Sequence, residues 1–425
     1  MTDGPETDRI VLMKHDPYAA LRLPGFRWVF ACHMLTIFAM QIQSTVFGWL
    51  IYDKTSSAVT LGLSGLCLFL PVLLLALPAG HLVDSRSRTS VLMAGLAVMI
   101  AGSVMLAFRS TDVVGIPFLF GSFAIVGIGS AFVSVARPVI MRDVVTPHAA
   151  ENASNWSSLG RRISSVAGPV TAGLLITAFG AQSALALAAG VFVLSLASAT
   201  HIRLPPSKRK TAGGEISFLE GIRFLRKTPL VLSVTLLDMF AVLFGGATGL
   251  LPIFASDILQ VGATGLGVLR AAPSLGSGAM SFALAHLPPM KRAGWSLLLS
   301  VVAYGVMTMI FGLSQSFTLS LAALLLVGAF DAVSVTIRST ILQIFVPPHL
   351  RGRVYGVNMI FVYSSNELGD FESGMVAALA GAPASVILGG IGAIVTAFCF
   401  GWQWPQLRSL KKLATPTASA LAYSP

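Results

Sequence analysis

The sequence predicts an all-α integral membrane protein with twelve transmembrane helices, arranged as two six-helix bundles with both termini in the cytoplasm. Three observations predict this fold class: apolar stretches of spanning length recur along the chain, Lys and Arg gather in alternate loops, and the second half repeats features of the first. Of the 425 residues, 55% are hydrophobic and only 11% are charged, whereas about a quarter of the residues in a soluble domain are charged. The bilayer is therefore the expected surroundings of most of the chain.

The apolar stretches have the length that a transmembrane helix needs, about 20 residues. Loops with charged residues or with Gly, Pro and Ser turn signals separate them. We place the spans at 28–52, 59–83, 91–108, 115–136, 155–179, 183–200, 230–254, 264–287, 294–314, 316–337, 354–380 and 383–403. The predicted domains are a cytoplasmic N-terminal tail (1–26), an N-terminal bundle (27–200), a basic cytoplasmic linker (201–229), a C-terminal bundle (230–404) and a cytoplasmic C-terminal tail (405–425).

The predicted orientation rests on Lys and Arg, because short loops that carry them stay in the cytoplasm. Loops and tails assigned to the cytoplasmic side hold 23 of the 28 Lys and Arg residues, with Arg137 and Arg338 among them, and the other side holds two. Apolar and charged residues alternate between 216 and 227 in the linker, which predicts an amphipathic helix on the membrane surface. A plain tether whose charges hold the topology explains the linker equally well.

Features of the first half recur 201 residues later in one register. The matched pairs are Arg137 with Arg338, Pro147-His148 with Pro348-His349, Gly168 with Gly369, and Gly173 with Gly374. Two parallel six-helix repeats are a known layout of membrane proteins, with the ligand path at the interface between them.

The formal net charge of +11 does not indicate nucleic acid binding, because the basic residues lie in short loops and not on one soluble face. Cys32, Cys67 and Cys399 lie in apolar stretches without the spacing of a disulfide framework or a metal site. The chain has no Walker loop, no dinucleotide fingerprint and no HExxH motif. We therefore expect no enzyme activity, no metal and no cofactor.

The loop after the second span carries the set Gly80, Asp84, Arg86 and Arg88. It resembles the loop 2–3 signature of the major facilitator superfamily, although Ser87 stands where a Gly is usual. Gly80 would permit close helix approach, and Asp84 would cap a facing helix or pair with an Arg in a closed state. The second-half copy at 285–292 keeps the basic residues but lacks the Asp. We interpret the four residues as a gating motif.

The fifth span contains Gly168, Pro169 and Gly173, preceded by Ser164. The segment resembles the GxxxGPxxGG element of export-type, antiporting members of that superfamily, with Ser164 and Ala172 in place of two glycines. Small residues four apart let helices pack closely, and a Pro inside a helix removes a hydrogen bond and bends it.

The acidic residues of the later spans carry the most specific resemblance. Asp238, Asp331 and the segment from Ser365 to Gly374 look like those of bacterial exporters similar to the enterobactin (siderophore) branch. This resemblance implies proton-driven export of small organic molecules, such as siderophores or drugs, by a multi-pass protein of the bacterial cytoplasmic membrane. The expected partners are a small-molecule substrate, protons and the bilayer, and we expect a monomer.

A carboxylate inside a membrane is costly and is a functional candidate by default. Glu367 lies near the midpoint of its span, so we predict that it carries the proton, with Asn366 and Asp370 on the same helical face and Glu372 on the opposite one. Asp238 and Asp331 are candidates for substrate or proton binding. Arg338 is either an alternating partner of Asp331 or its static ion-pair partner. The remaining candidates for the substrate cavity are Gln41 and Gln43 of the first span.

Arg161, Arg162 and Arg270 fall within spans, and we expect their long side chains to reach the nearest membrane surface. Binding of an anionic substrate is the alternative role for each of them. Two alternatives to a proton-coupled exporter stay open. One is an importer or facilitator of the same superfamily, and the other is a non-transporting membrane receptor or lipid-handling protein.

Overall fold

The computed structural model describes residues 16–108, 115–204, 218–246, 248–288 and 290–411, and every regular element within them is helical. The first half contains α1 (Pro24–Thr55), α2 (Ala58–Ser85), α3 (Arg88–Phe108), α4 (Ile116–Val144), the 3₁₀ helix η1 (Pro147–Ala149), α5 (Ala150–Phe179) and α6 (Ala181–Thr200). The second half contains α7 (Phe218–Lys227), α8 (Pro229–Phe244), α9 (Leu251–Ile253), the π-helical η2 (Phe254–Ile258), α10 (Gly262–His286), α11 (Ala293–Leu313), α12 (Phe317–Phe345), α13 (Arg351–Ala380), α14 (Ala382–Gln403) and α15 (Pro405–Ser409).

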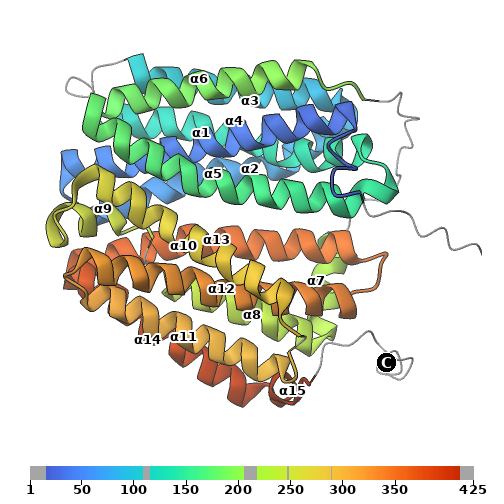
Figure 1. Ribbon diagram of the computed structural model, residues 1–425, viewed down its shortest axis with the longest axis vertical. Coiled ribbons are helices and arrows are strands. Elements are labelled where there is room, and N and C mark those ends of the chain that lie inside the picture. The colour runs from blue at the N-terminus through green and yellow to red at the C-terminus, as the bar shows by residue number, and fades with distance from the viewer. Residues whose placement is uncertain (1–15, 109–114, 205–217, 247, 289, 412–425) are drawn as a thin grey trace, which may run out of the picture.

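The helices form two bundles that lie side by side, α1 to α6 in one and α7 to α15 in the other (Figure 1). We call the end of the molecule where α6 ends and α7 lies the linker end, and the opposite end, where α9 lies, the far end (Figure 1). Each bundle has its own apolar core. The bundles contact each other mainly through two helix pairs, α5 with α10 and α2 with α13.

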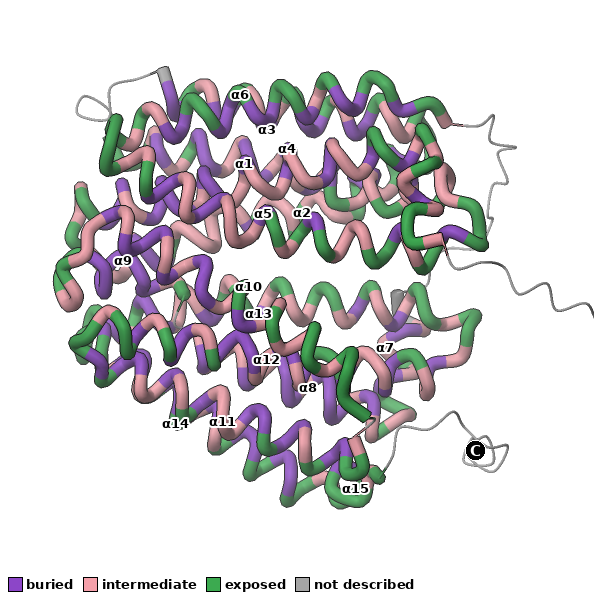
Figure 2. The backbone as a smooth tube through the Cα atoms, in the orientation of Figure 1, coloured by how far each residue is buried: buried purple, intermediate pink, exposed green. Residues whose placement is uncertain are grey.

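The outer surface of the bundles is apolar. Leu77, Leu379 and Trp402 are exposed by 83%, 88% and 82%, and exposed residues line the outward sides of the helices (Figure 2). So large an exposed apolar area is unfavourable in water and favourable in contact with lipid. Nine helices of the described residues are long and apolar enough to cross a membrane. The other three predicted spans correspond to α10 and α13, which carry charged residues, and to the interrupted series α8, α9 and η2.

Local sequence explains the turn between α1 and α2 at the far end. Ser56 adopts a left-handed conformation with φ 46°, which ends α1, and Ser57 then caps α2 by accepting a hydrogen bond from the Thr60 amide at 3.4 Å. A second turn type occurs twice. Gly180 and Gly381, which lie 201 residues apart, have φ 82° and 90° and connect α5 to α6 and α13 to α14. These angles favour glycine, so the register of the sequence repeat extends to this turn.

Several helices continue well beyond the apolar stretches that predict them. α4 extends to Val144 and α12 to Phe345, so Arg137 and Arg338 lie inside helices and not in loops, contrary to the prediction. Polar partners explain the difference: Arg137 bonds His33 Nδ1 of α1 at 2.8 Å, and Arg338 pairs with Asp238 of α8. In each half, the arginine therefore bonds a residue of the first long helix of its own bundle.

Part of the predicted linker forms the expected amphipathic helix, α7. It meets α8 at 104°, so it lies across the end of its bundle. Its Leu225 is buried against Val354 and Val357 of α13, and Glu220 forms an ion pair with Arg353. The apolar face of α7 therefore packs on protein. The Lys208–Lys210 run and Ile216 lie outside the described residues.

Part of the predicted N-terminal tail packs onto the first bundle. Asn152 of α5 accepts a hydrogen bond from the Ala20 amide at 3.0 Å and donates one to the Pro17 carbonyl at 2.7 Å, and Tyr18 lies against Trp156 with a centroid distance of 6.0 Å. The segment from 16 to 23 is thereby fixed to the start of α5.

The close contact between α10 and α12 in the second bundle can be tested directly by substitution. A Cβ at Gly276 would overlap the Leu325 carbonyl, whereas a Cβ at Gly278 of the same helix would meet no atom within 4 Å. Gly276→Ala is expected to destabilise the protein by about 1–3 kcal/mol through overpacking, and Gly278→Ala is expected to leave stability unchanged. Thermal unfolding of the purified variants in detergent measures both. Equal stability of the two variants would contradict this packing.

Candidate functional site

A cavity of about 600 Å³ lies between α5 of the first bundle and the helices of the second. Its lining includes residues 158–165 of α5 and 355–370 of α13, which places it in the half of the molecule toward the linker end. Five predicted site residues line it: Asp238, Asp331, Arg338, Asn366 and Asp370. The second bundle thus brings together acidic residues that are up to 132 positions apart in the sequence.

Arg338 forms a buried ion pair with Asp238, and both residues are less than a tenth exposed. Asp331 lies farther from it, with its carboxylate oxygen 4.0 Å from the Arg338 guanidinium and a side chain that is 42% exposed. The prediction paired Arg338 with Asp331 because the two share a helix. The structure places Asp238 closer, since α8 packs against α12 at this level. Asp331 is therefore left with its side chain open to the cavity.

Two arginines of α5 face the same cavity. Arg162 donates hydrogen bonds to Ser277 and Ser281 of α10, each at 2.9 Å, and Arg161 is exposed with one long bond to Ser158 at 3.5 Å. The expectation that they reach the membrane surface is wrong. α5 begins at Ala150, so Arg162 is about three turns from the helix start, and its side chain points between the bundles.

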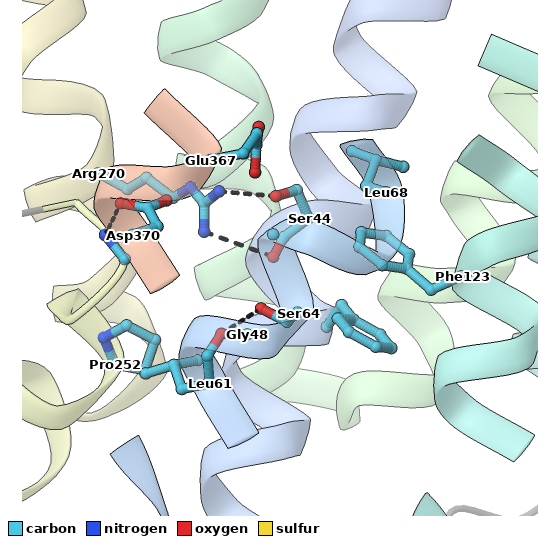
Figure 3. Close-up of a pocket in the computed structure, with 13 residues that line it drawn as sticks. Ser44, Gly48, Leu61, Ser64, Leu68, Phe123, Pro252, Arg270, Glu367 and Asp370 are labelled. Carbon is cyan, nitrogen blue, oxygen red and sulfur yellow. Dashed lines mark hydrogen bonds between the residues drawn. The ribbon is translucent and has the colours of Figure 1, made fainter. Parts of the chain in front are cut away.

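A second cavity, of about 80 Å³, lies between the bundles toward the far end and is shown in Figure 3. Arg270 of α10 reaches across it and donates to Ser44 of α1, at 2.7 Å to the hydroxyl and 3.4 Å to the carbonyl. Glu367 and Asp370 of α13 lie beside that guanidinium (Figure 3) and interact with it electrostatically. The expectation that Arg270 reaches the membrane surface is therefore wrong.

Glu367 lines the small cavity without a hydrogen bond or an ion pair to any residue that the structure describes. Its carboxylate lies over Gly65 of α2, where a Cβ would come within 2.5 Å of Oε2. Asp370 has partners: it accepts hydrogen bonds from the Gly249 amide at 3.0 Å and from Thr248 at 3.5 Å, in the break between α8 and α9. Asp370 lines both cavities and so connects them.

The remaining α13 candidates lie on different faces. Asn366 faces the large cavity, but its side-chain amide donates to the Val362 carbonyl of the same helix at 2.7 Å. Glu372 lines neither of the two cavities.

The prediction that Gln43 faces a cavity is wrong. Gln43 is 1% exposed and points into the first bundle, where its Oε1 accepts a hydrogen bond from Ser103 of α3 at 3.0 Å. Gln41 packs with its Cβ against Gly168 of α5 and lines neither cavity. The polar residue that α1 contributes is Ser44, since the residues on either side of it turn into the bundle.

The four gating-motif residues have separate surroundings in this conformation. A Cβ at Gly80 would meet no atom within 4 Å, so no helix approaches there, contrary to the expectation. Asp84 and Arg86 are exposed, and Arg88 forms an ion pair with Asp143 of α4, inside the first bundle. The structure records no ion pair of Asp84 with a described residue.

The small residues of α5 lie at two helix contacts. Gly168 faces the α1 backbone near Phe38, and Gly173 lies against Ala263 and Thr264 of α10. Gly267 of α10 in turn packs on the Pro169 carbonyl. α5 continues through Pro169 as one helix to Phe179. The segment from Gly168 to Gly173 therefore packs α5 on α1 of its own bundle and on α10 of the other bundle.

The architecture described so far, with two bundles and carboxylates in cavities between them, is one that transporters share. A family model described as a transmembrane secretion effector of the major facilitator superfamily matches residues 15–418. The chain belongs to the major facilitator superfamily. It is accordingly a multi-pass membrane protein that transports small molecules, and not an enzyme.

Relatives and solved structures of this superfamily agree with the assignment. The chain is 26% identical over 367 residues to the multidrug efflux pump Tap of Mycolicibacterium fortuitum, covering 81% of this chain and 87% of Tap. It is 27% identical over 385 residues to the enterobactin exporter EntS of Escherichia coli, covering 88% of this chain and 86% of EntS. A bacterial homologue of the human lysosomal transporter Spinster, inward-facing and occupied, has the same fold, with a TM-score of 0.71 at 15% identity over 93% of this chain and 100% of that one. The nucleoside transporter NupG also has this fold, with a TM-score of 0.70 at 14% identity, covering 89% of this chain and 100% of NupG.

Sequence reasoning did not indicate Ser44 or Gly65 of the small cavity, and for Arg270 it favoured the membrane surface. Arg270 carried a signal, since an arginine inside an apolar stretch is costly unless it has a partner. Its partner lies 226 positions away in the other bundle, and no local pattern indicates such a contact.

Proposed function

We propose that this member of the superfamily is a proton-coupled exporter of small organic molecules, acting as a monomer in a bacterial cytoplasmic membrane, with twelve spans and both termini in the cytoplasm. The observation that carries the proposal is Glu367, a carboxyl group placed between the two bundles without a hydrogen bond or an ion pair to a described residue. Such groups in membrane proteins mark ion and proton pathways. The names of the two relatives, a multidrug efflux pump and an enterobactin exporter, support drugs or siderophores as substrates.

The direction of access follows from the basic residues. The loops at the linker end carry Arg86, Lys291 and Arg292, and basic loops stay in the cytoplasm. The large cavity then lies on the cytoplasmic side. The far end is closed by contacts between the bundles: Tyr52 donates to the Asp257 carboxylate, and Gly62 packs on Gly374. This arrangement supports loading of substrate from the cytoplasm.

Closure of the far end involves Glu367 directly. When α2 and α13 come together, the Glu367 carboxyl loses water and gains no hydrogen bond from the described residues around it. The nearby Arg270 guanidinium is bonded to Ser44 and shared with Asp370, so a buried Glu367 carboxylate without a hydrogen bond remains costly, and a protonated carboxyl avoids most of that cost. The far end therefore closes most easily after Glu367 has taken up a proton from outside. Asp370 lines both cavities, so it is the next group that can accept the proton on its way to the cytoplasm.

Closure of the linker end involves Asp84. It is exposed in the present conformation, and α13 begins at the same end with Arg351. A carboxylate stabilises a helix N-terminus, so we assign Asp84 the role of binding the facing bundle when this end closes.

The test of this function is transport by purified protein in liposomes, with the linker end facing outward and an acidic lumen. Enterobactin and cationic drugs are the substrates to screen. Substrate uptake into the lumen together with alkalinisation of the lumen, abolished by a protonophore, is the expected result. Movement of substrate and proton in the same direction would indicate an importer. Absence of any substrate-dependent proton flux would indicate a receptor or lipid-handling protein.

A further inference from the structure

The large cavity has opposite charges on its two sides. Arg161 and Arg162 lie on α5 of the first bundle, and Asp331 lies on α12 of the second. Asp238 and Arg338, which also line the cavity, neutralise each other in a buried ion pair. Asp370 accepts hydrogen bonds from Gly249 and Thr248, and its charge is offset by the Arg270 guanidinium beside it. The charges left for a ligand are therefore the two arginines on one side and Asp331 on the other.

These charges interact across the cavity without contact. Asp331 and Arg162 affect each other electrostatically, yet no carboxylate of the described residues lies within 4.0 Å of the Arg161 or Arg162 guanidinium. Arg162 is instead bonded to two serine hydroxyls, which leave its positive charge without a counter-ion. The Asp331 side chain is 42% exposed and accepts no hydrogen bond from a described residue. The two arginines thus lack a partner of opposite charge, and Asp331 has only the Arg338 guanidinium, which lies 4.0 Å away and is already paired with Asp238.

A ligand that carries both charges satisfies both sides at once. Its anionic group would bind the planar guanidinium donors of Arg161 and Arg162, which suit carboxylates, and its cationic group would bind Asp331. A molecule with only one charge would leave the opposite side unpaired, which is the costly case for partly desolvated groups. The cavity volume of about 600 Å³ is in the range of pockets for drug-sized molecules.

We propose that the cavity selects zwitterionic organic molecules, binding their anionic group at Arg161 and Arg162 and their cationic group at Asp331. This inference rests on the proposed function in taking the cavity as the substrate site. It adds the charge class of the substrate.

The experiment compares probes that share one skeleton and differ in charge. Ciprofloxacin is a zwitterion, its ethyl ester a cation and its N-acetyl derivative an anion; ε-dansyl-lysine, its methyl ester and its α-N-acetyl derivative form a second set. Binding to purified protein in nanodiscs is followed by fluorescence at neutral pH without any gradient. In at least one set, the wild type is expected to bind the zwitterion about tenfold or more tightly than either derivative, a difference of about 1.4 kcal/mol.

Variants assign the two ends of the ligand. Arg162→Gln should remove the preference over the cationic ester, and Asp331→Asn should remove the preference over the acylated anion. Exposed Lys291→Gln and Glu372→Gln, outside the cavity, serve as charge-matched controls that keep both preferences. The proposal is overturned if the wild type prefers no zwitterion in either set, if it binds no probe, or if the two cavity variants keep the wild-type preferences.

Binding and transport can fail independently. If the protein prefers zwitterions but liposomes show no proton-linked transport, the proposal of proton-coupled export is wrong and the proposal of zwitterion selection holds. If proton-linked export occurs with singly charged substrates and no zwitterion preference, the exporter function stands and this inference is wrong.

Discussion

Glu367→Gln is expected to abolish the response of the transporter to pH. The amide imitates a permanently neutral carboxyl, so the far end should stay closed at every pH, and pH-driven substrate uptake should fall by about tenfold to a hundredfold, as expected for a loss of about 1.4–2.8 kcal/mol of coupling. Glu372→Gln removes a carboxylate from the same helix, five positions away, that lines neither cavity. It should behave as the wild type. Uptake at several imposed pH gradients measures both variants.

Distance measurements separate this coupling from a general loss of function. Spin labels at Asp53 and Ala380, exposed positions near the far end of each bundle, report its opening once the native cysteines are replaced. Lowering the pH from about 8 to about 5 should shorten the wild-type distance, because protonation lowers the cost of burying the carboxyl. In Glu367→Gln the distance should be short throughout. A variant that still opens with rising pH would assign the coupling to another group.

Removal of Asp238 is expected to have the largest effect on stability. Arg338 is 8% exposed and would remain buried without its ion-pair partner, which costs about 3–5 kcal/mol. Asp331→Ala should cost much less, since that carboxylate lies 4.0 Å away and is partly exposed. Thermal unfolding in detergent compares Asp238→Ala with Asp331→Ala.

A double variant distinguishes a structural role of the Asp238–Arg338 ion pair from a role in transport. Replacing both partners with apolar residues of similar size, Asp238→Leu with Arg338→Met, should recover most of the lost stability, because no charge is then left buried. If the double variant transports normally, the pair is structural. If it is stable but inactive, Arg338 acts in the transport cycle. A double variant as unstable as Asp238→Ala would show that the packing around the pair, and not the unpaired charge, causes the loss.

Composition and local pattern were sufficient for the overall class of fold. Apolar stretches of spanning length and the repeat at 201 residues predicted helical bundles, and the turn glycines Gly180 and Gly381 follow the same register. Helix ends were predicted less well. α12 continues past its apolar stretch to Phe345 because Arg338 finds a carboxylate inside the bundle, and hydropathy alone treats a charged residue as the end of a span.

The sequence by itself determined that this chain is a helical membrane protein and that Glu367, Asp370, Asp238 and Asp331 are costly acids inside it, because composition and helical period are local properties. The major facilitator type was indicated by the resemblance of its motifs. The tertiary structure alone decided the partners of the polar residues. Arg338 pairs more closely with Asp238 than with its helix neighbour Asp331, Arg270 reaches Ser44 in the other bundle, and Gln43 turns away from the cavity. Glu367 lies over Gly65 without a hydrogen bond from a described residue. These contacts join helices that are distant in the chain, and their geometry depends on how closely small residues let the two bundles approach.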